Sequence, residues 1–148
     1  MAGTWQLGGG GRAAYVYGMK PVALSALLAL TPLAAACEDE TLTGYAPGVY
    51  QLEEIDGERF EWGATLDLTE PGRISGQAPC NGYSADQAAP YPWFKPGPIV
   101  STRRACLHLN GEAAFFKALG EVTLAEASGP VLILSNEAGR EMVFRRAE

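Results

Sequence analysis

The middle of the chain consists of short apolar segments separated by turn residues. Residues 49–55 form one such segment, and Asp56-Gly57 after it is a dipeptide typical of a two-residue hairpin turn. Residues 65–69 alternate polar and apolar positions with a period of two, as in a strand with one buried face. Residues 70–73 resemble a turn and residues 74–76 its returning strand. This part of the chain therefore predicts antiparallel β-structure.

The pattern changes in residues 77–98, where prolines stand among aromatic residues. Proline has no amide hydrogen to donate to a sheet, so regular pairing is not expected through the later part of this segment. Residues 99–102 resume a strand pattern. Residues 111–119 predict the one helix of the chain, with Asn110 as its N-cap and Gly120 as its stop.

Three further strand segments complete the pattern. Residues 121–125, 131–134 and 141–145 predict three strands joined by turns that contain glycine. Residues 131–134 are apolar throughout, which predicts a central strand covered on both faces. Residues 48–148 are therefore expected to form one α+β domain, in which a curved, mainly antiparallel β-sheet, bent into a partial barrel, has one α-helix packed against it.

The stretch before Cys37 has a different pattern. From Met19 the chain has a short positive start at Lys20, then an apolar run, then three alanines before Cys37. This order is typical of a signal peptide, and the run is shorter than the roughly 20 residues that a membrane-spanning helix needs. Residues 19–36 are therefore predicted to be a signal peptide, and residues 1–18 an extension ahead of the true initiator.

Small residues directly before a cysteine resemble the bacterial lipobox, in which that cysteine is lipidated and becomes the new first residue. Leu33 stands four places before Cys37, whereas the commoner pattern has it three places before. The alternative is an ordinary cleaved signal. Lipidation of Cys37 would make residues 37–47 a linker between a membrane, expected to be the bacterial outer membrane, and a domain facing the periplasm.

Charge excludes one class of partner. All 17 acidic residues follow Cys37, together with nine of the 11 basic ones, so the part after the signal carries a formal charge of −8. Such a field repels nucleic acid unless a strong basic patch is present. Only two arginine pairs stand out, Arg103-Arg104 and Arg145-Arg146, so nucleic-acid binding is not expected.

Two cysteines remain after Cys37, at positions 80 and 106. In an oxidising compartment such a pair is more often a disulfide than a reactive site, and two buried free thiols are the alternative. A bridge between Cys80 and Cys106 would stabilise the fold by about 3.5 kcal/mol in the chain-entropy model.

The residues around these cysteines resemble a known family. Residues 76–84 match a G-x-x-x-C-N-x-Y-S motif, and residues 102–106 match a T-x-x-x-C motif ahead of the helix. In this order they resemble the META domain, also called the HslJ-like family of small bacterial envelope proteins. Residues 49–57 resemble the opening strand and turn of that family, although Tyr50 stands where a tryptophan is usual. The resemblance implies a compact α+β fold at the cell envelope, often on a lipoprotein and associated with stress tolerance, and it implies no catalytic residue.

Candidate catalytic residues are few. His108 is the single histidine, and Ser75 is one position late for a nucleophile elbow. One histidine and two bridged cysteines cannot form a zinc site, and no spacing fits a calcium loop. The chain is therefore expected to hold no metal and no cofactor and not to be an enzyme.

The loop rich in proline and aromatic residues is the remaining candidate site. Tyr91, Trp93 and Phe94 in a proline-stiffened segment suit contact with a partner at low entropic cost, or they cover one end of the sheet. Arg103 and Arg104 either face an anionic partner or pair with glutamates in solvent. The sequence thus predicts a non-enzymatic envelope module that binds or supports envelope components. The alternatives are a small inhibitor of a periplasmic enzyme that uses residues 88–98 as a wedge, and a carboxylate-dependent hydrolase.

Overall fold

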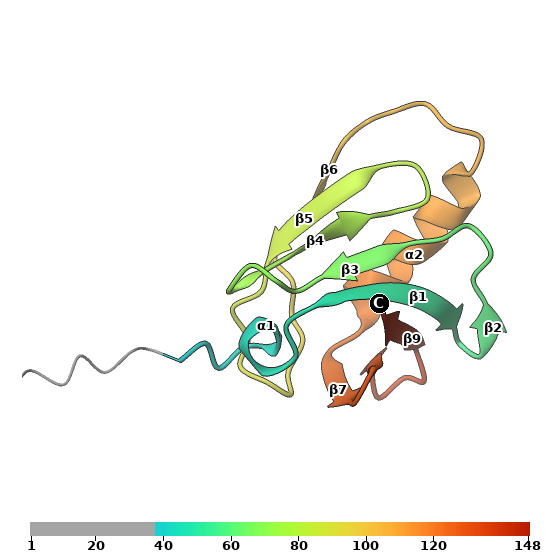
Figure 1. Cartoon of the computed structure of the whole chain (residues 1–148). Coiled ribbons are helices and arrows are strands. Elements are labelled where there is room, and N and C mark those ends of the chain that lie inside the picture. Colours follow the sequence, from blue (N-terminus) through green and yellow to red (C-terminus); the bar gives the residue numbers. More distant parts are fainter. Residues whose placement is uncertain (1–37) are drawn as a thin grey trace, which may run out of the picture. The chain divides into compact units, whose positions relative to one another are not determined.

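A computed structural model describes residues 38–148 (Figure 1). The predicted extension, signal peptide and lipidation site at Cys37 lie outside the described residues. The described elements are α1 (Leu42–Tyr45), β1 (Val49–Ile55), β2 (Glu58–Arg59), β3 (Thr65–Asp67), β4 (Arg73–Gln77), β5 (Gly82–Asp86), β6 (Val100–Ser101), α2 (Leu109–Glu121), β7 (Leu124–Ser128), β8 (Val131–Ser135) and β9 (Glu141–Arg146). None of these helices is long and apolar enough to cross a membrane.

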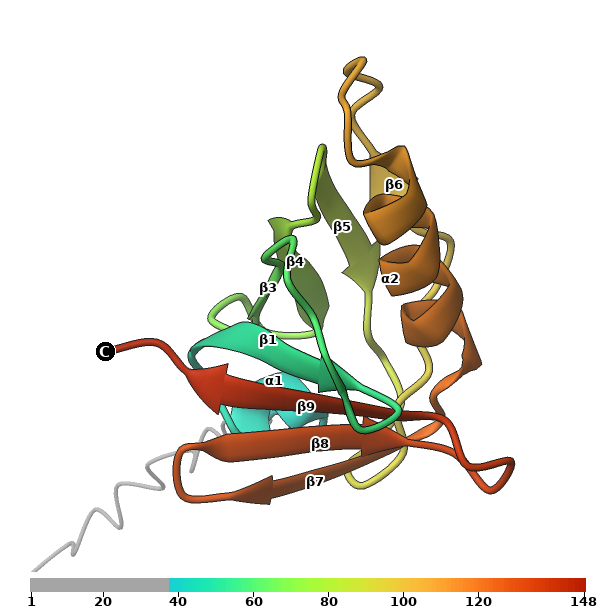
Figure 2. The ribbon, with the colours of Figure 1, turned by 90° about the vertical axis from the view of Figure 1, so that its right-hand side faces the viewer.

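The strands form one antiparallel sheet in the order β6-β5-β4-β3-β1-β9-β8-β7, with β2 paired to β1. The first long strand lies at the centre, between β3 and the last strand β9. Figure 2 shows that the sheet bends strongly, so that β7, β8 and β9 run across the direction of β5, and α2 lies along one side. The prediction of an α+β fold with a curved, mainly antiparallel sheet is confirmed, and the sheet does not close into a barrel.

The core follows from the alternation of strand residues. Tyr50 and Leu52 of β1 are buried, and Leu132 and Leu134 alternate in the same way on β8. Tyr50 has no exposed surface, and its hydroxyl donates to the Ala46 carbonyl at 3.1 Å. Tyr50 therefore fits the core with its polar end satisfied.

Helix α2 packs against the sheet through aromatic rings. The ring centroid of Tyr83 on β5 lies 5.3 Å from that of Phe115 and 5.6 Å from that of Phe116. The Tyr83 hydroxyl donates to the Thr65 carbonyl at 2.8 Å. Burial, and secondly the charge of Asp67, raise the pKa of Tyr83 far above its usual value. The hydroxyl therefore stays protonated as a donor that ties β5 to β3.

The predicted hairpin turn is confirmed. Asp56 and Gly57 have φ values of 53° and 80°, the two positive angles of a type I′ turn. The predicted strands all occur; β1 has the predicted bounds, and the bounds of the others are shifted by one to three residues. Strand β5 was not expected, because the prolines that follow it masked the alternation of Tyr83 and Ala85, which are both buried.

Two other expectations are wrong. Residues 38–47 are not only linker, because helix α1 buries Leu42 in the core and Ala46, the residue that caps the helix, is buried there as well. Residues 131–134 are not covered on both faces, because β8 lies one strand from the edge and leaves Val131 and Ile133 partly exposed. An uninterrupted apolar run gives no direct information on which face of a strand is covered.

The ends of α2 also differ from the prediction. The N-cap is His108, whose side chain makes no capping hydrogen bond, so Asn110 is not the cap but lies inside the helix. The helix passes Gly120 and ends at Glu121, where Val122 takes an extended conformation. Tertiary packing of the helix therefore outweighs the local preference of these two residues for the ends.

The two glycines of α2 predict opposite effects of the same substitution. A Cβ at Gly111 would lie 2.7 Å from Cδ2 of Trp62, whereas a Cβ at Gly120 would meet nothing within 4 Å. Gly111→Ala is expected to displace the Trp62 ring and lower the free energy of unfolding by about 1–2 kcal/mol. Gly120→Ala is expected to raise it by roughly 0.5–1 kcal/mol through helix propensity. Urea unfolding followed by circular dichroism measures both, and a gain in stability for Gly111→Ala would contradict the close packing of Trp62.

Candidate binding surface at the aromatic and proline loop

The loop between β5 and β6 is held in shape by one buried amide. Gln87 has no exposed surface. Its Nε2 donates to the carbonyls of Trp93 at 3.2 Å and Ala89 at 3.4 Å, and its Oε1 accepts from the Lys95 amide at 3.1 Å. These bonds replace the sheet pairing that prolines cannot provide, so the loop is a fixed structure without being a strand.

The loop also covers the edge of the sheet. The Phe94 amide donates to the Thr123 carbonyl, and the Ala125 amide donates to the Pro92 carbonyl, each at 2.8 Å. Phe94 is fully buried, whereas Trp93 is 56% exposed. Of two neighbouring aromatic residues, one therefore anchors the loop in the core and the other points to solvent.

An apolar groove of about 930 Å³ lies beside Trp93. It is formed by the loop, by the last turn of α2 and by the residues that lead into β7. Its lining consists of Ala89, Pro90, Trp93, Phe94, Lys95, Pro96, Gly97, Pro98, Ile99, Gly120, Val122 and Thr123. We call this the loop groove; Lys95 is its one charged lining residue.

The start of the described chain is paired with the same loop. The Tyr91 amide donates to the Glu40 carbonyl at 2.8 Å, and Thr41 and Pro90 form an isolated antiparallel bridge. The ring of Tyr91 stacks on that of Tyr45, with 3.8 Å between centroids and 10° between planes. The segment entering the domain and the aromatic loop therefore form one continuous surface.

Asp39 stabilises the segment through which the chain enters the domain. Its carboxylate accepts from the Thr43 hydroxyl at 2.5 Å and from the Thr41 amide at 2.9 Å. The bond from Thr43 holds the pKa of Asp39 below its usual value. Thr43 in turn accepts from the Gly72 amide at 2.8 Å, so the segment is bonded to the turn before β4 as well as to the loop.

Only some of the residues predicted to contact a partner are exposed on this surface. Tyr91 is partly exposed and Trp93 largely exposed, and both belong to this surface. Phe94 does not offer its ring to a partner, because the side chain is completely buried. Arg103 and Arg104 are exposed but do not line the loop groove, and neither forms an ion pair within residues 38–148.

The two later cysteines meet beside a polar network. The disulfide Cys80–Cys106 is formed, with 5.8 Å between its Cα atoms. The Glu112 carboxylate accepts from the Cys80 amide at 3.0 Å and from Asn81 Nδ2 at 2.8 Å. Asn81 Oδ1 accepts from the Thr102 hydroxyl at 2.9 Å and from the Arg104 amide at 2.7 Å. Asn81 is 3% exposed, so this network fixes the disulfide region to α2.

Sequence reasoning did not identify this network. The signals for it were Asn81 directly after a cysteine and a glutamate in the first turn of the helix. Every buried side-chain nitrogen and oxygen atom in the described part of the chain has a hydrogen-bond partner. The network is therefore satisfied, and it has a structural role.

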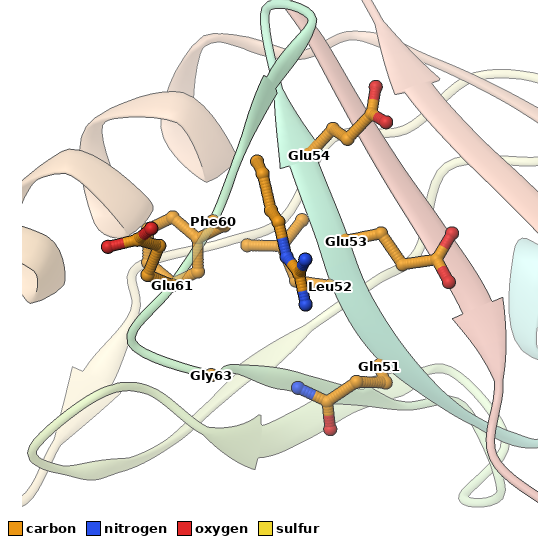
Figure 3. A pocket seen from close by; sticks show the side chains of 8 residues that line it. Gln51, Leu52, Glu53, Glu54, Phe60, Glu61 and Gly63 are labelled. Atoms are coloured by element: carbon orange, nitrogen blue, oxygen red, sulfur yellow. The ribbon is translucent and has the colours of Figure 1, made fainter.

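A second groove, of about 760 Å³, lies along β1 and carries three carboxylates, those of Glu53, Glu54 and Glu61 (Figure 3). The pairing of β1 with β9 shifts between Leu52 and Glu54, which is a bulge. In Figure 3 the bulge aims Glu53 and Glu54 to the same side, away from Glu61. Glu53 accepts from Arg145 Nε at 2.8 Å, so its charge is already paired.

Groups suited to metal binding are also absent from residues 38–148, where no cluster of three or more histidine, cysteine or carboxylate side chains is found. His108 is exposed, and its backbone amide donates to Cys106 Sγ at 3.2 Å. Among the described residues, the arrangement that stands out for contact with a partner is the exposed aromatic surface beside the loop groove.

Solved structures share this fold. The structure is similar to the NMR structure of a protein from Burkholderia xenovorans, with 25% identity and a TM-score of 0.56, covering 71% of this chain and 86% of that one. It is also similar to the crystal structure of a DUF4847 family protein from Bacteroides vulgatus, with 12% identity and a TM-score of 0.54, covering 70% of this chain and 94% of that one. The second likeness concerns the fold alone.

No curated protein matches the sequence. The family model of the META domain matches residues 40–148. The match begins two residues before α1, in agreement with the burial of Leu42 and Ala46. It spans both cysteines of the disulfide and the whole of the described sheet. The chain belongs to the META domain family.

Proposed function

We propose that this chain is a membrane-tethered, non-enzymatic module of the bacterial cell envelope, which binds an envelope component through the loop groove. The observation that carries this proposal is the exposure of Trp93 beside an apolar groove. A tryptophan side chain has a large apolar area and a polar N–H, and it is typical of sites that contact a partner. The bonds of Gln87 hold the loop before any partner arrives, which lowers the entropic cost of binding.

The tether is the second part of the proposal. The small residues before Cys37 support lipidation there, and cleavage at that point would leave a module facing the periplasm, anchored to the outer membrane. A disulfide suits such an oxidising compartment. A role in stress tolerance belongs to the same proposal and follows from the resemblance to envelope proteins of the HslJ-like family.

The two alternative functions are not favoured by a specific observation. An inhibitor would insert the loop into an enzyme as a wedge, but Phe94 is buried and the loop lies flat on β7 through its bonds to Thr123 and Ala125. A carboxylate-dependent hydrolase needs two free carboxylates facing one another, whereas Glu53 is paired with Arg145 and lies apart from Glu61.

Intact mass measurement of the membrane-extracted protein tests the tether. The expected mass is that of a chain beginning at Cys37 and carrying lipid, with the two later cysteines oxidised to one disulfide. In a Cys37→Ser variant we expect the protein to leave the membrane fraction. Retention of Met19 in the extracted protein, or an unmodified Cys37 on a protein that still sediments with membranes, would overturn the proposal.

A further inference from the structure

We infer that the surface formed by Tyr45, Tyr91, Trp93 and the loop groove lies against the lipid bilayer that holds the anchor. We call these three residues and the groove the aromatic pole. The inference rests on the proposed function, because it requires the lipid on Cys37. It identifies the component bound by the loop groove as the interfacial region of a membrane.

The position of the tether is the first argument. The Glu40 carbonyl is bonded to the Tyr91 amide, so the chain enters the domain at the aromatic pole. Cys37 precedes Glu40 by three residues, and three residues span at most about 10 Å when fully extended. A lipid on Cys37 inserted in a bilayer therefore brings this surface, and no other end of the domain, next to the headgroups.

The chemistry of the exposed side chains is the second argument. Tyr45 is 60% exposed and Trp93 is 56% exposed. Tyrosine and tryptophan concentrate at membrane interfaces, where the ring lies among apolar groups and the polar end meets water or headgroups. The loop groove beside Trp93 adds apolar walls, and its single charged lining residue is a cation, Lys95.

The charges near the aromatic pole indicate whether electrostatic attraction or apolar contact dominates its binding to the membrane. Residues 38–40 are all acidic and stand where the chain approaches the membrane. Anionic lipids would repel them, and one lysine does not outweigh three carboxylates. Contact with the bilayer therefore depends on the aromatic rings and the groove, with the lipid anchor keeping the surface close.

Two tryptophans give a matched test. Helix α2 has 13 residues and is about 20 Å long. Trp62 packs on Gly111 near its first turn, whereas Gly120 at its last turn lines the loop groove beside Trp93. Trp5 lies in the segment that cleavage removes, so Trp62 and Trp93 are the only tryptophans of the mature protein. A bilayer at the aromatic pole is near Trp93 and far from Trp62.

The experiment places the full lipidated mature protein in vesicles of phosphatidylethanolamine and phosphatidylglycerol that contain lipid spin-labelled near the headgroup. The Trp62→Phe variant reports on Trp93, and the Trp93→Phe variant reports on Trp62. We expect a blue shift and loss of most of the emission from Trp93, with little change for Trp62. The unsubstituted protein should divide into one quenched and one unquenched fraction, which supports the assignment without any variant.

Three results would overturn the inference, and they are distinguishable. If Cys37 carries lipid and neither tryptophan is quenched, the tether stands and the aromatic pole faces away from the membrane. If Trp62 is quenched as strongly as Trp93, the domain has no preferred orientation on the bilayer. If Cys37 carries no lipid, the inference and the proposed function fail together.

Discussion

Reduction of the disulfide between Cys80 and Cys106 is expected to lower the free energy of unfolding by about 3.5 kcal/mol, because the unfolded chain then regains the conformational freedom that closing a loop of this length removes. For a domain of this size the loss corresponds to a fall in melting temperature of roughly 10–20 °C. Thermal unfolding with and without a reductant, followed by circular dichroism, measures the difference.

Both proteins of this comparison carry Cys37→Ser, and the matched control adds Cys80→Ser and Cys106→Ser. It should unfold at the temperature of the reduced protein, and the reductant should not change it further. Equal melting temperatures for the oxidised and reduced proteins would mean that the disulfide adds no stability. The polar network around Asn81 would then hold the segments of Cys80 and Cys106 to α2 by itself.

Replacement of Asn81 by alanine is expected to cost about 3 kcal/mol of unfolding free energy. The substitution removes one bond to the Glu112 carboxylate and two bonds to the segment after β6. Glu112 is among the buried residues, and a buried carboxylate that loses a donor keeps its desolvation cost without the compensating bond. Urea unfolding of the oxidised protein measures the loss.

A double-mutant cycle separates this network from the general effect of a smaller side chain. Asn81→Ala and Glu112→Ala should together cost less than the sum of the two, with a coupling of about 1.5–3 kcal/mol. Thr102→Val removes a single, partly buried bond and is expected to cost at most about 1 kcal/mol. Additive effects of Asn81 and Glu112 would contradict a charge-assisted bond between them.

The strands of the sheet could be predicted wherever polar and apolar residues alternate. Thr65 to Leu68 show that alternation and are observed as β3, with Leu66 and Leu68 buried. Strand β5 alternates as well, but its inward residue Ala85 is small and prolines follow it closely. Helix α1 has only four residues, and bonds from Thr41 to the loop and from Thr43 to the turn before β4 hold it where Leu42 is buried.

The candidate site was only partly predictable. The sequence indicated an aromatic and proline loop, but adjacent residues of that loop differ completely in exposure, as Trp93 and Phe94 show. In a strand this difference would follow from the period of two, whereas in a loop it depends on the bonds of Gln87 and on contact with the segment before β7. Neither contact has a local signal, because the partners are distant in sequence.

The sequence by itself determined the class of fold, the pairing of Cys80 with Cys106 as the expected bridge, and the family, since alternation, motif order and turn residues are local properties. Only the tertiary structure decided where the chain enters the domain and which aromatic ring meets solvent. Both depend on long-range contacts, the bridge of Thr41 with Pro90 and the backbone bonds that join the loop to residues 123–125. Such contacts exist only once the segments have been brought together.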